Sequence, residues 1–286
     1  DDYKYKYKYS TPSILHSKTG VDSTHTIDTH LHYNKSYHSQ TKSSMRPLSS
    51  KDIIRQKIAQ ENKKIVKSNK YYIDKLNVET IYDTDHIRIQ HSIGNPTHNH
   101  TSIYIESVTT IGAAIAHHNL HKTHEICILN FADAIKPGGG YLNGRGAQEE
   151  TLCRQTLLYP TIVGNDMYVE NERHGNKETG SDIMIYSPNV YVIRDDFYNK
   201  IKSPFKVNVI SSPAVDNRKA ILSSSQNLME KRIRKIVLLA ASKRNDVLIL
   251  GAFGCGVFKN DPKQVAKIFK KVLKDEGLKN YFVSVI

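Results

Sequence analysis

The residues best suited to chemistry are two adjacent glutamates, Glu149 and Glu150, which follow three consecutive glycines, Gly138, Gly139 and Gly140. Glycine lets backbone N–H groups come within hydrogen-bonding distance of a ligand where a Cβ would clash. Successive helical side chains diverge by about 100°, so neighbouring carboxylates cannot serve one function in one direction. We predict that one carboxylate grips ligand hydroxyls while the other faces a reacting bond. The alternatives are a plain turn and carboxylates that complement a helix dipole.

The spacing of the two glutamates restricts the chemistry of a glycosidase. Ordinary inverting glycosidases hold two carboxyl groups about 6.5–9.5 Å apart, and retaining ones hold them about 5–5.5 Å apart. Neighbours on one helix cannot easily flank a sugar from opposite faces. If the chain is a glycosidase, one glutamate must therefore protonate the leaving oxygen and later activate water.

A second glycine cluster has the sequence LILGAFGCGVFKNDP, with Gly251, Gly254 and Gly256 after a strand-like run. Asn260 or Asp261 can cap a following helix, and Pro262 suits its first turn. A strand, a glycine-rich loop and a helix N-terminus together favour a diphosphate-binding site. The spacing GxxGxG differs from the dinucleotide GxGxxG and the nucleotide GxxxxGK patterns, so a redox cofactor or an NTPase is poorly supported.

Short strand-like and helical segments alternate through the chain from residue 50 onward. Such alternation predicts a mixed, largely parallel sheet with helices on both faces. The expected helices are 52–69, 109–120, 148–159, 221–243 and 261–277. The expected strands are 86–93, 101–108, 125–132, 182–195, 205–215, 246–254 and 281–286.

The first 49 residues differ in composition from the rest. They alternate Tyr and Lys at the start, and Ser, Thr, His and Asn dominate afterwards, so we expect a basic, disordered tail. We divide the chain into this tail, residues 1–49, and one catalytic domain, residues 50–286, whose residues 50–80 form a helical extension.

The net charge of +13 predicts attraction to a polyanion, although a basic surface that only keeps the protein soluble is as good an interpretation. The three cysteines lie far apart and form no CxxC pair, so a disulfide framework or a cysteine zinc site is not expected. No apolar run reaches the roughly 18–20 residues of a membrane span. We expect a soluble, intracellular protein.

Together, these motifs resemble the bacterial-type poly(ADP-ribose) glycohydrolases, a branch of the macrodomain fold. The signature is three glycines, a short spacer and Gln-Glu-Glu, and the resemblance extends to LNFADAIKPGGG, YSPNVYVIRDD, SSPAVDN and LGAFGCGVFKNDP. It covers roughly Ser50 to the C-terminus, and the first 49 residues show no counterpart. The resemblance implies an α/β fold, a macrodomain-like three-layer α/β/α arrangement around a mixed sheet, with an N-terminal helical extension.

The resemblance also implies roles for individual residues. Glu150 would be the catalytic acid that protonates the departing ribose 2′-oxygen and then activates water, and Glu149 would bind hydroxyls of the ribose being cleaved. The implied substrate-binding residues are Asn130, Asp133, Gly138, Gly139, Gly140, Gln148, Gly254, Cys255, Gly256, Val257 and Phe258. Phe258 would pack against the distal ribose, and the loop of Gly254, Cys255, Gly256 and Val257 would wrap the diphosphate. The family needs neither metal nor cofactor.

The expected partners are poly(ADP-ribose), ADP-ribose and poly-ADP-ribosylated proteins, bound by a monomer without a membrane. The alternative is a module that reads ADP-ribose without cutting it, which an intact pair of glutamates disfavours. Direct nucleic-acid binding stays open, but it leaves both glycine loops unexplained. The histidines of HHNLHKTH lack neighbouring carboxylates at helical spacing, so we expect a solvated helix end rather than a metal site.

Overall fold

The computed structural model describes residues 48–175, 179–218 and 224–286. The expected disordered tail therefore lies outside the described residues, apart from Leu48 and Ser49. Seven strands form one mixed sheet in the order β1-β4-β5-β3-β6-β7-β2. The strands are β1 (Glu79–Ile81), β2 (Ser102–Ile103), β3 (Ile126–Ala132), β4 (Met184–Arg194), β5 (Lys200–Pro213), β6 (Val247–Ile249) and β7 (Ser284–Val285).

The sheet is largely parallel, as predicted. Strand β3 lies at its centre and runs parallel to β5 and β6, while β7 runs parallel to β6 and β2. The pairs β1–β4 and β4–β5 are antiparallel. The carboxyl ends of β3, β5 and β6 therefore meet at one edge of the sheet, where ligands of open α/β sheets bind.

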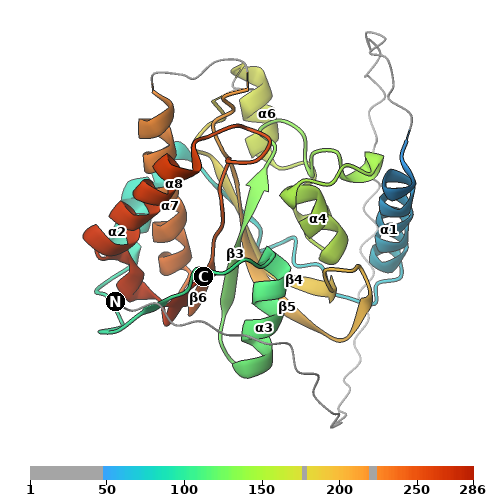
Figure 1. The fold of residues 1–286 in the computed structure, drawn as a ribbon, viewed down its shortest axis with the longest axis horizontal. Helices are drawn as coiled ribbons and strands as arrows, with labels where there is room; N and C mark the ends of the chain where they lie inside the picture. Colours follow the sequence, from blue (N-terminus) through green and yellow to red (C-terminus); the bar gives the residue numbers. More distant parts are fainter. Residues whose placement is uncertain (1–47, 176–178, 219–223) are drawn as a thin grey trace.

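Helices cover both faces of the sheet (Figure 1). The helices are α1 (Ser50–Lys67), α2 (His86–Ser92), α3 (Thr110–Leu120), α4 (Gln148–Gln155), α5 (Tyr159–Ile162), α6 (Asp166–Arg173), α7 (Ser225–Ser242) and α8 (Pro262–Lys270). Alternate residues of β3 point to opposite faces. Cys127 and Leu129 join the core under α2, α7 and α8, whereas Ile126 and Ile128 join the core under α3 and α4. The resulting three layers confirm the predicted α/β/α arrangement.

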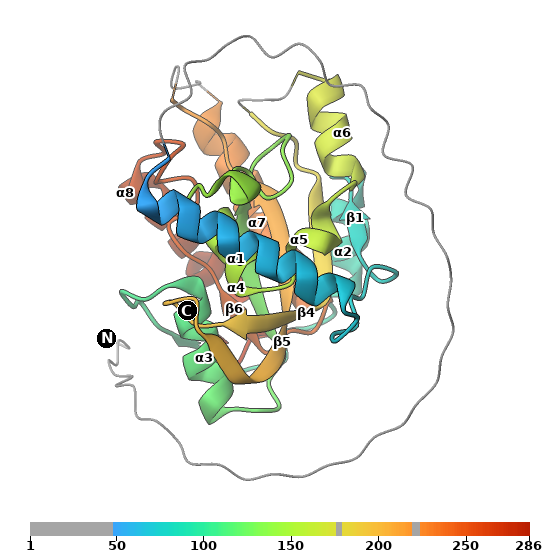
Figure 2. The ribbon, with the colours of Figure 1, turned by 90° about the vertical axis from the view of Figure 1, so that its right-hand side faces the viewer.

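Helix α1 lies outside this sandwich and crosses over α4 (Figure 2). It begins at a capping box, in which Ser49 and Asp52 each accept a hydrogen bond from the other's backbone N–H. The predicted start near Ser50 is confirmed. Among the described residues, none of the helices combines the length and apolar character that crossing a membrane requires.

Some expected elements differ from the structure. Residues 86–93 are a helix rather than a strand, because Ile89 and Ile93 lie one helical turn apart and both pack against α7 and its neighbours. Helix α4 ends at Gln155, since the Thr156 hydroxyl donates to the Leu152 carbonyl and residue 156 bridges to β4. The strands expected at 101–108 and 246–254 shorten to two and three residues.

Candidate active site

The glycine–glutamate motif forms a loop between the end of β3 and the first turn of α4. Gln148, the first residue of α4, fixes this arrangement: its Oε1 accepts from the Phe131 N–H at 2.9 Å and its Nε2 donates to the Leu129 carbonyl at 2.8 Å. A further bond of 3.2 Å runs from Nε2 to the Thr110 hydroxyl of α3. The side chain of Gln148 thus pins α4 to the strand that delivers the loop.

The Glu149 carboxyl group is buried, and both of its oxygens accept hydrogen bonds from the protein. Its Oε2 accepts from the Asp133 N–H at 2.8 Å, and its Oε1 accepts from Gly138 N–H at 3.2 Å and from Asn130 Nδ2 at 3.3 Å. Burial raises the pKa of Glu149 to about 8, an effect that the N–H donors oppose because they favour the charged form. Glu149 therefore ties the glycine loop to the end of β3, in addition to any contact with a ligand.

The Glu150 carboxyl group bonds to the last of the three glycines, whereas Glu149 bonds to the first. Its Oε1 accepts from the Gly140 N–H at 2.8 Å, and among the described residues its Oε2 has no hydrogen-bond partner. Gly139 has a φ of +53°, and a Cβ there would lie 2.8 Å from Glu150 Oε1 and 3.3 Å from Glu149 Oε2. Glycine is thus required at this position both for its backbone conformation and to make room for the two carboxylates.

Asn130 and Asp133 join the same network, although their side chains bond mainly to the protein. Asn130 is fully buried and donates to Glu149 and, at 3.0 Å, to the Ser211 hydroxyl of β5. Its Oδ1 is buried and, within the described part of the chain, unpartnered. Asp133 Oδ1 accepts from the N–H groups of Ile135 and Lys136 and so shapes the turn that leads into the glycines.

The second glycine loop follows β6 at the same edge of the sheet. Gly254 has a φ of +72°, and a Cβ there would lie 2.6 Å from Asn260 Nδ2 and 2.7 Å from the Ala214 methyl group. Asn260 holds the loop by donating to the carbonyls of Val215 and Gly254. As predicted, the Asp261 side chain caps α8, with Pro262 at its start.

Phe258 lies beside the segment that follows β5. Its carbonyl accepts from the Asn217 N–H at 2.8 Å, and the Arg218 guanidinium lies 5.3 Å from the centre of its ring. Arg218 is held by Asp216 through several hydrogen bonds. The second loop begins beside the strand that delivers the first, because a Cβ on Gly251 would lie 2.9 Å from the ring of Phe131 in β3. The structure therefore brings both predicted motifs to one site.

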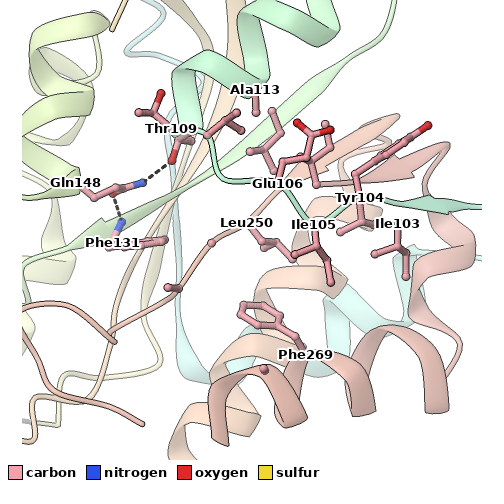
Figure 3. Close-up of a pocket in the computed structure, with 18 of the residues that line it drawn as sticks. Ile103, Tyr104, Ile105, Glu106, Thr109, Ala113, Phe131, Gln148, Leu250 and Phe269 are labelled. Atoms are coloured by element: carbon pink, nitrogen blue, oxygen red, sulfur yellow. Dashed lines mark hydrogen bonds between the residues drawn. The ribbon is translucent and has the colours of Figure 1, made fainter. Parts of the chain in front are cut away.

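A cavity of about 830 Å³ adjoins Gln148 (Figure 3). Gln148 and Phe131 lie on one side of it, Tyr104, Ile105 and Glu106 on the opposite side, and Phe269 of α8 below. The cavity is mostly apolar, as small-molecule sites usually are. Sequence reasoning missed these lining residues, since they come from segments far apart in the chain that carry no shared motif.

Helix α1 braces the glycine–glutamate loop from outside. Asn62 donates from Nδ2 to the carbonyls of Cys153 and Arg154 at the end of α4, and its Oδ1 accepts from Arg194 Nε of β4. A Cβ on Gly146 would meet the Arg55 guanidinium at 2.5 Å. The loop and α4 are thus held between β3 and α1.

The histidine cluster lies at the other end of β3 from the catalytic loop. His117 Nε2 lies 3.0 Å from His124 Nδ1, and the rings of His117, His121 and His124 contact one another. Across residues 48–175, 179–218 and 224–286, no group of three or more His, Cys, Asp or Glu side chains is arranged to hold a metal ion. The rings pack together at the end of α3, and His117 is more buried than the solvated helix end that we expected.

Comparison with known proteins places this site in a family. The model of the microbial-type PARG catalytic domain matches residues 28–195. The match starts upstream of residue 50, so the prediction that the first 49 residues have no counterpart in the family holds at most for residues 1–27. The match ends before the second glycine loop. No curated protein matches the sequence.

Solved structures extend the similarity over most of the chain. Poly(ADP-ribose) glycohydrolase from Thermomonospora curvata is 30% identical, with a TM-score of 0.75 over 82% of this chain and 92% of that one. The same enzyme bound to the inhibitor ADP-HPD gives a TM-score of 0.73 at 30% identity and the same coverage. The enzyme from Deinococcus radiodurans in complex with ADP-ribose is 31% identical, with a TM-score of 0.66 over 74% of this chain and 86% of that one. Together with the family match, these similarities show that the chain belongs to the microbial-type poly(ADP-ribose) glycohydrolases (PARG).

Proposed function

We propose that this protein hydrolyses the ribose–ribose O-glycosidic bonds of poly(ADP-ribose) and releases ADP-ribose, with Glu150 as both general acid and general base. The observation that carries the proposal is the position of the Glu150 carboxyl group. One oxygen is held by the Gly140 N–H of the glycine loop, and the other is free of partners among the described residues. A carboxyl group oriented in this way can deliver a proton in one direction.

The reaction needs two steps at the same carboxyl group. In the first, protonated Glu150 gives its proton to the leaving ribose 2′-oxygen as the bond from that oxygen to the anomeric carbon breaks. The anomeric carbon becomes oxocarbenium-like, and the substrate's own diphosphate stabilises its positive charge. In the second, the Glu150 carboxylate takes a proton from water as the water oxygen bonds to the anomeric carbon, which regenerates the acid.

The two loops and the cavity support one orientation of ADP-ribose. The loop that contains Gly254, Cys255, Gly256 and Val257 offers backbone N–H groups to the diphosphate at the start of α8. The distal ribose would then lie between the loop of Gly138–Gly140 and Phe258. The apolar cavity beside Gln148 is large enough for the adenosine half, with Glu106 as an acceptor for the exocyclic amine.

In this orientation the two glutamates have separate tasks. Glu149 would accept from ribose hydroxyls with the lone pairs that its three N–H donors leave unused, while it holds the loop against β3. Asn130 would bind the ribose through its unpartnered Oδ1 or orient Glu149 through its amide. Poly-ADP-ribosylated proteins would be the natural carriers of the substrate.

The test is the release of free ADP-ribose from poly(ADP-ribose), in the presence of EDTA, by the wild type and by Glu150→Gln. Calorimetric binding of ADP-ribose would be measured for both proteins. We expect release by the wild type alone and binding by both, because the amide keeps the shape of the carboxyl group but cannot supply the proton. Binding by both proteins with release by neither would identify a reader of ADP-ribose and refute the mechanism.

A further inference from the structure

The rim of the catalytic loop carries positive charge that the reaction described above does not use. Lys136 precedes the three glycines, Arg145 follows them, and Arg55 of α1 lies on the same loop. Lys136 and Arg145 are exposed, and within the described ranges neither forms an ion pair. Arg55 lies 3.8 Å from Asp52, a carboxylate that also accepts from Ser49.

Arg145 is fixed close to the catalytic carboxyl group in spite of its exposure. Its N–H donates to the Gly140 carbonyl at 3.1 Å, and its own carbonyl accepts from the buried Arg154 guanidinium at 2.7 Å. Its side-chain stem lies against the Cα of Gly140, whose N–H holds Glu150. The two bonds fix the backbone of Arg145, and the stem against Gly140 keeps the side chain beside the loop.

Arg55 adds a second guanidinium to the same rim. A Cβ on Gly146 would lie 2.5 Å from Cζ and from both terminal nitrogens of Arg55, so the flat face of the guanidinium rests on the loop. Its N–H edges then point along the loop surface rather than into it. Planar guanidinium groups bind phosphate oxygens through pairs of N–H groups, which makes them well suited to a diphosphate.

We infer that Arg145, assisted by Arg55, binds the diphosphate of the neighbouring ADP-ribose unit, the one that carries the leaving 2′-oxygen. This contact would make the enzyme prefer a polymer to a single ADP-ribosyl group. The inference rests on the proposed function. The leaving 2′-oxygen belongs to an adenosine ribose whose own 5′-oxygen carries a diphosphate. That diphosphate must pass the solvent side of Glu150, where Arg145 is anchored, and Arg145 would stabilise the leaving unit without touching the reacting atoms.

Binding can be tested without turnover in the Glu150→Gln background. Calorimetry would compare ADP-ribose with a dimer of two ADP-ribose units joined by the ribose–ribose bond. We expect the dimer to bind about tenfold more tightly, and Arg145→Ala to remove most of this gain while the affinity for ADP-ribose changes less than twofold. Arg145→Lys should keep part of the gain, and Lys63→Ala, an exposed cation on α1, should keep all of it.

Kinetics supply a second readout. For the dimer, Arg145→Ala should raise KM about tenfold with little change in kcat, and should lower the slope of log KM against log salt by about 1. For an aryl glycoside of ADP-ribose, whose leaving group carries no phosphate, the same substitution should change kcat/KM less than twofold.

Equal affinity of Glu150→Gln for ADP-ribose and for the dimer would overturn the inference and leave the proposed function intact. The same holds if Arg145→Ala loses as much kcat/KM on the aryl glycoside as on the dimer. Absence of ADP-ribose binding would instead refute the proposed function, and the inference with it.

Discussion

Replacing Gly139 by alanine should slow catalysis strongly while the fold survives. The new Cβ would lie 2.8 Å from Glu150 Oε1, whereas ordinary van der Waals contact begins at 3.4 Å, so the carboxyl group must move by about 0.6 Å. Misplacement of a reacting group by about 1 Å costs about 100-fold in rate. The displacement also weakens the bond from Gly140 N–H to Glu150. We therefore expect kcat to fall about 10- to 100-fold.

The structure provides a matched control for this substitution. Gly164 also has a positive φ, +80°, but a Cβ there would meet no atom within 4 Å. Alanine in the left-handed region costs about 1–2 kcal/mol at either position, which lowers Tm by roughly 2–8 °C for a domain of this size. Both variants should lose similar stability, yet Gly164→Ala should keep its activity.

The assay is ADP-ribose release together with thermal unfolding for both variants. Wild-type kcat in Gly139→Ala would refute the reasoning, since the carboxyl group could then tolerate the Cβ without losing its function. An equal loss of kcat in Gly164→Ala would also refute it, because general strain rather than contact with Glu150 would explain the result. ADP-ribose affinity should change less than kcat in Gly139→Ala.

Three further results are expected. Asn62→Ala removes the hydrogen bonds from Asn62 to two carbonyls of α4 and from the buried Arg194 Nε to Asn62, and urea unfolding should show a loss of about 2–3 kcal/mol, unlike Lys63→Ala. Burial lowers the pKa of His117 to about 4, with His118, His121, His124 and Asp246 as charged neighbours. His117 in the unfolded chain therefore binds its proton at a higher pH than in the folded protein. The free energy of unfolding should fall as the pH drops from about 6.5 towards 4, and it should fall less in His117→Leu. Glu106→Gln should weaken calorimetric binding of ADP-ribose several-fold but leave binding of its hypoxanthine analogue unchanged, whereas equal losses would exclude contact with the amine.

The central part of the site could be predicted because its signals are local. The apolar run from Ile126 to Leu129, the three glycines and the paired glutamates lie within one strand–loop–helix unit, and each local preference agrees with the fold. The two glycine loops begin at the same edge of the sheet because the strands that precede them are parallel neighbours, and the resemblance had already assigned both loops to one ligand.

Other features depend on contacts between distant segments. Residues 86–93 alternate Ile and polar residues, which favours a strand, but Asp83 and Asp85 before them mark a helix start whose buried side is chosen by α7. The cavity has no sequence signal, since Glu106, Gln148 and Phe269 meet only in the folded sheet. The engagement of both Glu149 oxygens by the protein was likewise not predictable, because it depends on the path of the loop.

The brace formed by α1 has a consequence for the order in which the site is built during synthesis. Asn62 emerges from the ribosome 91 residues before Cys153 and 132 residues before Arg194. At about 5–20 residues per second, helix α1 waits roughly 7–26 seconds for its last partner. An isolated helix of 18 residues is only marginally stable in water during that time. A nascent chain that ends before Arg194 therefore carries the whole glycine–glutamate motif while Asn62 still lacks the bond that ties α1 to β4.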